Sequence, residues 1–408
     1  MNKSKNSIGL VEFVALMAMM TSLTAMSIDS MLPALSEISL DLGVKRSNDS
    51  QLVISSLFMG MAVGQMFLGP LSDTLGRKTT VYIGFGFFTT GCLMSMLTTN
   101  FQFMLAGRVF QGLGSAASRI VVLAIVRDLY SGREMARVMS FVMAVFIIVP
   151  VVAPLFGQAV LIVSHWRWIF AIFLIIVMFT AIWFAWRQPE TLPPENRIPF
   201  SMLSIGESIR ETFKHRQVFG YTVAMGMIFG AFIGYLNSAQ QVFQELYGLG
   251  ILFPIYFAIL AISLGCASIV NSRVVMLFGM RKLSFISLKG IVALSIIFFG
   301  ITSIYSGQPP LWSLTLYFLL TFFGLGILFG NLNALAMKPL GHIAGVGAAM
   351  VGSLSTFISL LLGTVVGQSY NGTILPLIGG FTIFSITATI AMRWAESNEP
   401  LQNSNSKG

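Results

Sequence analysis

The chain has 408 residues, of which 55% are hydrophobic and only 10% are charged. Soluble domains carry roughly 25% charged residues, so this composition excludes a soluble domain and indicates a protein that lies in lipid. The formal net charge is +9, and the basic residues cluster in short loops between apolar runs. That placement favours a polytopic membrane protein over a nucleic-acid-binding protein or a membrane-surface patch.

Windows of about 20 apolar residues are long enough for a helix to cross a bilayer core of about 30 Å. They predict an all-α membrane protein with twelve spans, near residues 10–32, 51–70, 79–98, 102–126, 138–162, 167–186, 218–240, 250–271, 283–304, 311–336, 344–368 and 374–393. The first run, which follows Lys3 and Lys5, could also be a signal peptide. We favour a span because the run is long enough to cross and many further runs follow.

The distribution of Lys and Arg predicts the orientation of these spans. Eighteen lie in loops on the N-terminal side, and Lys45, Arg46 and Arg167 lie in loops on the other side. Loops rich in Lys and Arg stay in the cytoplasm. Because the number of spans is even, we expect both termini in the cytoplasm and the chain in the inner (plasma) membrane.

The longest connection, 187–217, contains several prolines and charges and a plausible amphipathic surface helix. It predicts an N-terminal six-helix half (1–190), a linker (191–217), a C-terminal six-helix half (218–395) and a short tail (396–408). The loop "LSDTLGRK" in the first half has a counterpart, "VNSRVVMLFGMRK", in the second. A coincidental basic turn in each half is the alternative. Two such halves are typical of major facilitator transporters.

Little in the sequence indicates catalysis or a bound cofactor. Cys92 and Cys266 both lie in apolar runs and are interpreted as small buried hydrophobic residues. The three histidines are scattered, and no glycine loop of the G-x-x-x-x-G-K type is present. We therefore expect no enzyme, no metal and no cofactor, and an energy source that is an ion gradient and not ATP.

Six short motifs carry a resemblance to a known family. They are "SIDSMLPAL", "GPLSDTLGRK", "GRVFQGLGSAA", "IVRDLYSG", "VAPLFGQ" and "VFQELYGL". The second, third and fifth resemble motifs A, B and C of the major facilitator superfamily, and all six together resemble its bicyclomycin-resistance (Bcr/CflA) branch of drug:proton antiporters. The resemblance covers nearly the whole chain and implies proton-coupled export. Motif C departs from the usual pattern, with Ala153 before its proline and Gln158 where a second glycine is common.

The motif A loop places an acid and two bases between two uncharged runs. Gly69 and Gly76 would allow close helix approach and a tight turn, and Asp73 could pair with a base or lie near the positive N-terminal end of a helix from the other half. Arg77 is placed to meet Asp128, so we expect a latch that breaks when the cytoplasmic face opens. The alternative is a solvated loop that only fixes orientation. The expected gating set is Gly69, Asp73, Gly76, Arg77, Lys78 and Asp128, and the expected antiporter motif is Pro150, Pro154 and Gly157.

Charged residues inside spans are costly and are candidates for function. Asp29 and Arg108 lie near the outer ends of the first and fourth spans, at depths that agree within roughly 5 Å at 1.5 Å per residue. We expect them to share a proton-dependent contact. The alternatives are a helix-end residue in the headgroup region for Asp29 and a side chain that reaches the outer surface for Arg108.

Arg119 lies deeper in the fourth span, on the same helical face as Arg108, with Gly112 and Ser115 between them. This basic stripe suits an anionic substrate, and a structural pair for Arg119 is the alternative. A cavity for small molecules is mostly apolar with a few polar groups. The expected cavity residues are Arg119, Gln111, Ser115, Asn237, Gln240, Asn331 and Asn333.

We expect proton-driven efflux of amphipathic drugs, and hence multidrug or antibiotic resistance, through rocking of the two halves. One alternative keeps the fold and makes the chain a dedicated exporter of an anionic metabolite or siderophore. Another is a non-transporting membrane sensor, although the short termini leave no room for a signalling domain. The expected partners are a small-molecule substrate, protons and the lipid bilayer, with no nucleic acid, and the chain is expected to be a monomer.

Overall fold

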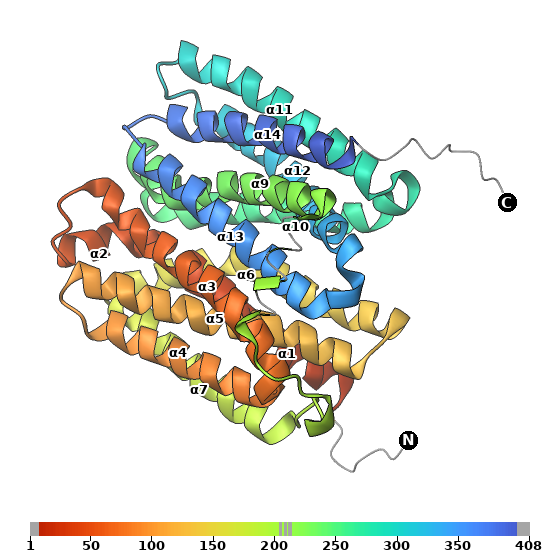
Figure 1. The fold of residues 1–408 in the computed structure, drawn as a ribbon. Coiled ribbons are helices and arrows are strands. Elements are labelled where there is room, and N and C mark those ends of the chain that lie inside the picture. Colours follow the sequence, from red (N-terminus) through yellow and green to blue (C-terminus); the bar gives the residue numbers. More distant parts are fainter. Residues whose placement is uncertain (1–7, 204–205, 208–209, 211–213, 398–408) are drawn as a thin grey trace.

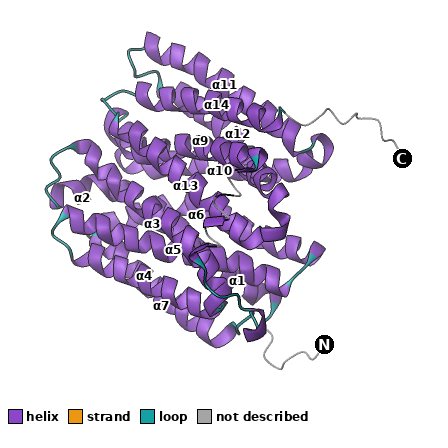
Figure 2. Ribbon diagram, in the orientation of Figure 1, coloured by secondary structure: helices purple, strands orange, loops and turns teal. Residues whose placement is uncertain are grey.

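The fold was obtained as a computed structural model that describes residues 8–203, 206–207, 210 and 214–397. The described part of the chain is helical and contains no strand (Figure 2). The expected tail beyond residue 397 and the middle of the helix expected in the linker lie outside the described residues. The helices are α1 (Leu10–Asp29), α2 (Leu35–Asp41), α3 (Leu52–Leu75), α4 (Arg77–Leu97), α5 (Phe101–Leu129), α6 (Gly132–Val163), α7 (Arg167–Arg187), α9 (Arg216–Gln240), α10 (Phe253–Phe278), α11 (Met280–Ile304), α12 (Leu311–Met337), α13 (Ala344–Gln368) and α14 (Leu375–Glu396).

Twelve helical segments of the described chain are long and apolar enough to cross a membrane, which confirms the predicted all-α architecture. Several predicted spans are too short, among them the first, the fifth and the eighth, which continues to Phe278. The first continues to Asp41, past Pro33. This proline stands in the first turn of a 3-10 helix, where its missing N–H removes no helical hydrogen bond. The fifth begins at Gly132 because a helix can project beyond the bilayer with charged residues in its first turns.

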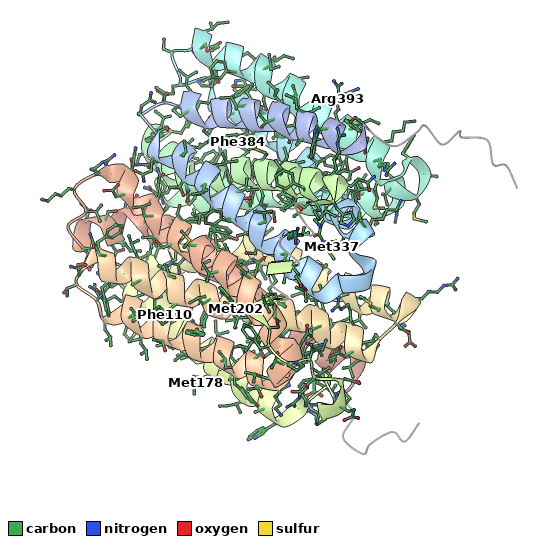
Figure 3. The ribbon with its side chains drawn as sticks, viewed as in Figure 1. Phe110, Met178, Met202, Met337, Phe384 and Arg393 are labelled. Carbon is green, nitrogen blue, oxygen red and sulfur yellow. The ribbon has the colours of Figure 1, made fainter. Side chains whose placement is uncertain are left out.

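The surface of the bundle is apolar along the helices, as expected for contact with lipid. On α7, Ile175, Met178 and Phe179 are each more than half exposed, and Met178 lies at the outer edge of the bundle (Figure 3). A water-soluble protein rarely exposes a continuous apolar surface of this kind.

The first six spans, α1 to α7, pack mainly with one another, and so do the last six, α9 to α14 (Figure 1). The two groups meet along α3 against α13 and along α6 against α10. Because the number of spans is even, α1 begins and α14 ends at the same end of the bundle. We call this end the termini face and the other end the opposite face.

Glycine allows helices of the first group to touch backbone to backbone. A Cβ built on Gly112 of α5 would lie 2.0 Å from the carbonyl oxygen of Leu57 on α3, and one on Gly60 would lie 2.0 Å from that of Val109. Helices in lipid associate through close van der Waals contact at small residues, since the lipid supplies little hydrophobic force. The α3–α5 contact therefore fixes the position of α3, which carries the motif A loop at its end.

Candidate functional site

The turn of the motif A loop consists of one residue, Gly76, between the last residue of α3 and the first of α4. Its backbone angles are φ +97° and ψ 162°, a region that is open to glycine and strained for other residues. The turn places Asp73, on the last turn of α3, directly beside Arg77, the first residue of α4.

Arg77 is the centre of a charged cluster at the termini face. Its guanidinium pairs with Asp73, its Nε donates to Asp128 Oδ2 at 2.9 Å, and its Nη1 also donates to Ser72 Oγ at 3.0 Å. The Arg77 side chain is only 7% exposed, so these bonds are largely shielded from water. The expected contact between Arg77 and Asp128 is present.

The cluster also reaches the second group of helices. Gly69 of α3 faces α13 so closely that a Cβ on it would lie 3.0 Å from Ala349 Cβ. A Cβ on Gly345, in the first turn of α13, would lie 3.6 Å from Asp73 Oδ2. The Asp73 carboxylate thus lies at the N-terminal end of α13, where the unpaired N–H groups and the helix dipole favour a negative charge.

The segment after α7 is bound to the same loop, which the sequence did not indicate. Glu190 accepts hydrogen bonds from the backbone N–H groups of Arg77 and Lys78, both at 3.0 Å, and of Thr191 and Leu192 at 2.9 and 3.0 Å. Partial burial would raise the pKa of this carboxyl, but the four N–H donors outweigh it and hold the pKa below its ordinary value.

Three more hydrogen bonds hold this segment and the start of α4 in place. Thr191 Oγ1 donates to Asp128 Oδ2 at 2.9 Å, and the Ile198 N–H donates to the Asp73 carbonyl at 3.0 Å. Lys78, which also belongs to the expected gating set, donates from Nζ to the Ala185 carbonyl at 2.9 Å. A Pro-Glu-Thr sequence after a span is the only signal in the sequence, and it does not show what Glu190 binds.

At the opposite face, uncharged amides join the two groups of helices. Gln241, the first residue after α9, bonds with Gln51 and donates to Asn48 Oδ1 at 3.0 Å. Asn48 donates to the carbonyl oxygens of Gln368 and Tyr370 at 3.0 and 2.8 Å. We call Asn48, Gln51, Gln241, Gln368 and Tyr370 the amide closure.

Two expected cavity residues belong to this closed region. Asn237 Nδ2 donates to Ser55 Oγ at 3.1 Å, and Gln240 bonds with Ser36. Both amides are at most 2% exposed. They join the two groups of helices and do not line an open space in this conformation.

Arg108 is fully buried and is held by the first group of helices. Its Nε donates to the Val53 carbonyl at 3.0 Å, and its two terminal nitrogens donate to Gln111 Oε1 and the Ser27 carbonyl, both at 2.7 Å. The expected contact with Asp29 is absent among the ion pairs of the described chain. The alternative, a side chain that reaches the outer surface, does not occur either, because backbone carbonyls of α1 and α3 take up its donors.

Asp29, the last residue of α1, is 5% exposed and has no side-chain hydrogen bond within the described residues. On α9 of the second group, the Tyr235 hydroxyl is likewise buried without a hydrogen-bond partner within the described residues. The backbone next to Asp29 also contacts motif C, because a Cβ on Gly157 of α6 would lie 2.1 Å from the Ser30 carbonyl oxygen. Helix α6 runs from Gly132 to Val163 with Pro150 and Pro154 inside it.

A pocket of about 160 Å³ lies between α3, α5, α12 and α13 near the termini face. Of the expected cavity residues, Arg119 and Asn333 line it. The others lie elsewhere: Gln111 bonds to Arg108, Ser115 Oγ is buried without a partner, and Asn331 exchanges hydrogen bonds of 3.0 and 3.1 Å with Asn271 of α10.

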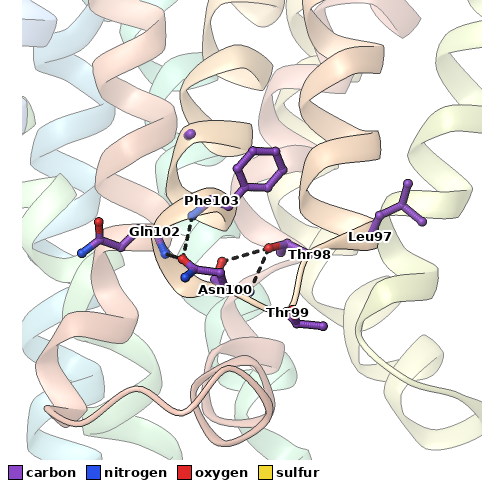
Figure 4. Close-up of a pocket in the computed structure, with 7 residues that line it drawn as sticks. Leu97, Thr98, Thr99, Asn100, Gln102 and Phe103 are labelled. Atoms are coloured by element: carbon purple, nitrogen blue, oxygen red, sulfur yellow. Dashed lines mark hydrogen bonds between the residues drawn. The ribbon is translucent and has the colours of Figure 1, made fainter.

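A larger hollow of about 620 Å³ lies at the loop between α4 and α5. Figure 4 shows Asn100 there, which accepts hydrogen bonds from the N–H groups of Gln102 and Phe103 at 2.8 and 3.2 Å and so caps α5. Its lining contains no charged residue and none of the expected site residues. It is therefore not taken as the functional site.

Comparisons with known proteins agree with this arrangement. The family model described as Major Facilitator Superfamily matches residues 15–364. An "Uncharacterized MFS-type transporter YdgK" of Bacillus subtilis (strain 168) is 30% identical over 91% of this chain and 94% of its own length. A "Bicyclomycin resistance protein homolog" of Haemophilus influenzae is 27% identical over 92% of this chain and 94% of its own.

Among solved structures, the human organic anion transporter MFSD10 has a similar fold, with a TM-score of 0.70 at 14% identity. The match covers 95% of this chain and 100% of that one. The xylose transporter XylE from E. coli matches with a TM-score of 0.71 at 12% identity, over 96% of this chain and 98% of that one. At these identities the likeness concerns the fold alone.

Proposed function

The chain belongs to the Major Facilitator Superfamily, and from this we propose that it exports amphipathic drugs in exchange for protons as a member of the bicyclomycin-resistance (Bcr/CflA) branch. It is a multi-pass membrane transporter of small molecules with twelve spans and is not an enzyme. Relatives named for bicyclomycin and multidrug resistance, at 27% and 24% identity, support drug efflux as the direction of transport.

The observation that carries the proton-coupling part of the proposal is the environment of Asp29. A carboxyl group that is almost fully buried in a spanning helix, without a hydrogen bond or a cation, is a candidate for carrying a proton. Asp29 ends α1, and the 3-10 turn that follows it at Leu32–Ala34 contacts both α6 and α9, so Asp29 lies near the place where the two groups of helices meet. A change of its charge would therefore affect how the two groups meet.

We propose that the two closures alternate during transport. The amide closure joins the groups at the opposite face, and the Arg77 cluster with Asp73 joins them at the termini face. The amide closure consists of neutral hydrogen bonds that water can replace, and at the termini face the link between the groups is the approach of Asp73 to the N-terminal end of α13. Rocking of residues 1–190 against residues 218–395 then exposes the region between them to one side at a time.

The excess of Lys and Arg on the termini side supports an orientation with that face in the cytoplasm of the plasma (inner) membrane. Drugs then enter from the cytoplasm, and protons enter from outside when the amide closure opens. One chain contains both closures, so we propose that the monomer is the transporting unit.

Proteoliposomes with the purified chain and an acidic lumen test the proposal. Ethidium and chloramphenicol added outside should accumulate above their external concentration, and a protonophore should abolish the accumulation. Empty liposomes control for passive trapping. If neither compound accumulates while the reconstituted protein retains its helical circular dichroism, drug export driven by protons is contradicted.

A further inference from the structure

The pocket between α3, α5, α12 and α13 contains more positive than negative charge. Four charged residues line it, namely Asp73, Arg77, Arg119 and Arg127. Arg77 pairs with Asp73 and also with Asp128, so its charge is neutralised within the charged cluster. Arg119 and Arg127 have neither a hydrogen bond nor an ion pair in the part of the chain that the structure describes.

The Arg119 and Arg127 side chains are both exposed where they line the pocket, and the depth of Arg119 in its helix makes a missing counter-charge costly for that residue. Arg119 lies ten residues before the end of α5, or roughly 15 Å at 1.5 Å per residue, which is well inside the bilayer. A Cβ on Gly345 would lie 3.8 Å from Arg127 Nη2, so Arg127 stands at the N-terminal end of α13. The Asp73 carboxylate serves this positive helix end from one side. An anion bound in the pocket would add a negative charge beside Arg119 and Arg127.

The rest of the lining fits a molecule with an anionic end and an apolar body. Asn333 and Gln65 supply amide groups, whereas Ile120, Leu123 and Ala348 are apolar. The volume of about 160 Å³ is enough for a small aromatic carboxylate and too small for a large drug. Arginine suits this role because its planar guanidinium binds a carboxylate through two parallel hydrogen bonds.

We propose that this pocket binds the carboxylate or other anionic group of an amphipathic substrate, with Arg119 and Arg127 as its ligands. That the bound anion is a transported substrate rests on the proposed function; that the pocket binds an anion does not. An anionic lipid headgroup presents similar chemistry, and the experiment separates the two sources. The binding claim requires neither a membrane gradient nor Asp29.

The test uses the full chain in a neutral detergent and three probes with the same ring: benzoate, benzyl alcohol and benzylamine. Dissociation constants are measured by ligand-observed NMR titration for the parent, Arg119→Gln, Arg127→Gln and the control Arg133→Gln, which removes an exposed charge at the start of α6. Each pocket variant should weaken benzoate binding by about ten-fold or more. The control should match the parent, and benzyl alcohol and benzylamine should change little.

Arg119→Lys keeps the charge without the planar fork and should retain more benzoate binding than Arg119→Gln. Equal benzoate binding by the parent and both Gln variants would overturn the proposal. So would a parallel loss of all three probes with earlier melting, since Arg119 would then hold helices together. In nanodiscs, full displacement of benzoate by phosphatidylglycerol but not by phosphatidylcholine would assign the pocket to a lipid headgroup and overturn the substrate claim.

The result is independent of the transport assay. Selective benzoate binding without proton-driven accumulation of drugs would leave this site standing and contradict the proposed function. If drugs accumulate but benzoate binding does not depend on Arg119 or Arg127, only the proposed anion-binding pocket is contradicted.

Discussion

At the scale of single residues, the backbone conformation of Gly76 determines how Asp73 and Arg77 of the charged cluster are placed. A Cβ at this position would strain the backbone at φ +97° and would lie 2.5 Å from Glu190 Oε2. We predict that Gly76→Ala costs about 1–3 kcal/mol of folding free energy, because the strain adds to a partial loss of the Glu190 hydrogen bonds. The measurement is the melting temperature of the purified protein in detergent.

Gly86, on the helix α4 that follows the turn, is a matched control. Its surroundings are open and its backbone is helical, so Gly86→Ala should melt at or slightly above the temperature of the parent. Equal melting of both variants would mean that the turn at Gly76 tolerates a side chain and does not fix Asp73 and Arg77.

The sequence predicts some contacts of single residues and not others, for physical reasons. Arg77 could be assigned to Asp128 because both stand at the ends of neighbouring spans, where few partners are available. Arg108 could not be assigned, because it bonds to backbone carbonyls of Ser27 and Val53. Every residue has a carbonyl, so a pattern of side chains carries no information about which of them a buried arginine will meet.

At the scale of elements, Glu190 connects the segment after α7 to α4. Its carboxylate accepts hydrogen bonds from the first two backbone N–H groups of that helix. An anion at a helix N-terminus satisfies unpaired donors and meets the positive end of the dipole. The segment thereby connects the end of the first group of helices to the loop that faces α13. We expect the linker to move together with this loop.

The pKa of Glu190 lies below its ordinary value of 4.5. The stabilisation from its charge is therefore complete above pH 4.5 and is lost as the pH falls through the lower folded value. We predict that amide hydrogen exchange of residues 77–78 and 191–192 stays slow from pH 8 to pH 5, after correction for intrinsic rates. Below pH 4 it should rise.

Glu190→Ala should give fast exchange of the same amides at every pH. Glu195→Ala removes an exposed acid from the same segment and should leave their exchange unchanged. Slow exchange in Glu190→Ala would show that the segment is held by other contacts, such as the Ile198 hydrogen bond to Asp73.

Hydropathy was sufficient to predict the number of spans, because a membrane helix must satisfy its own backbone and remain apolar over its length. It was not sufficient for the first span, which continues through Pro33 to Asp41. The contact of Glu190 with the start of α4 could not be predicted either, because loop residues follow no periodic sequence pattern. The position of a loop depends on the helices that it crosses.

At the scale of the whole molecule, the two closures hold opposite ends of the same interface and oppose each other. Asp73→Asn should weaken the contact with α13 by about 1–3 kcal/mol, and Gln241→Ala should weaken the amide closure by a similar amount. The first change should lengthen the distance between the termini-face ends of α3 and α13, and the second should shorten it. Both follow because weakening one closure favours the state held by the other.

Spin labels at those two helix ends, measured by double electron–electron resonance in nanodiscs, report the distance distributions. Thr387→Ala, on α14 away from both closures, controls for a general effect of substitution. Identical distributions for Asp73→Asn, Gln241→Ala and the parent would show that neither set of bonds governs the conformation. The motif A loop would then serve only to fix orientation.

In the proposed mechanism, the transporter exchanges a drug molecule for a proton that Asp29 carries. The most direct test of this exchange is the luminal pH of proteoliposomes that contain a trapped pH-sensitive dye and an acidic lumen. Addition of ethidium outside should raise the luminal pH for the parent and for the control Glu134→Gln, because each molecule of drug that enters releases protons. Asp29→Asn should give no pH change while it still exchanges labelled for unlabelled ethidium. A rise in luminal pH equal to that of the parent in Asp29→Asn vesicles would contradict the account.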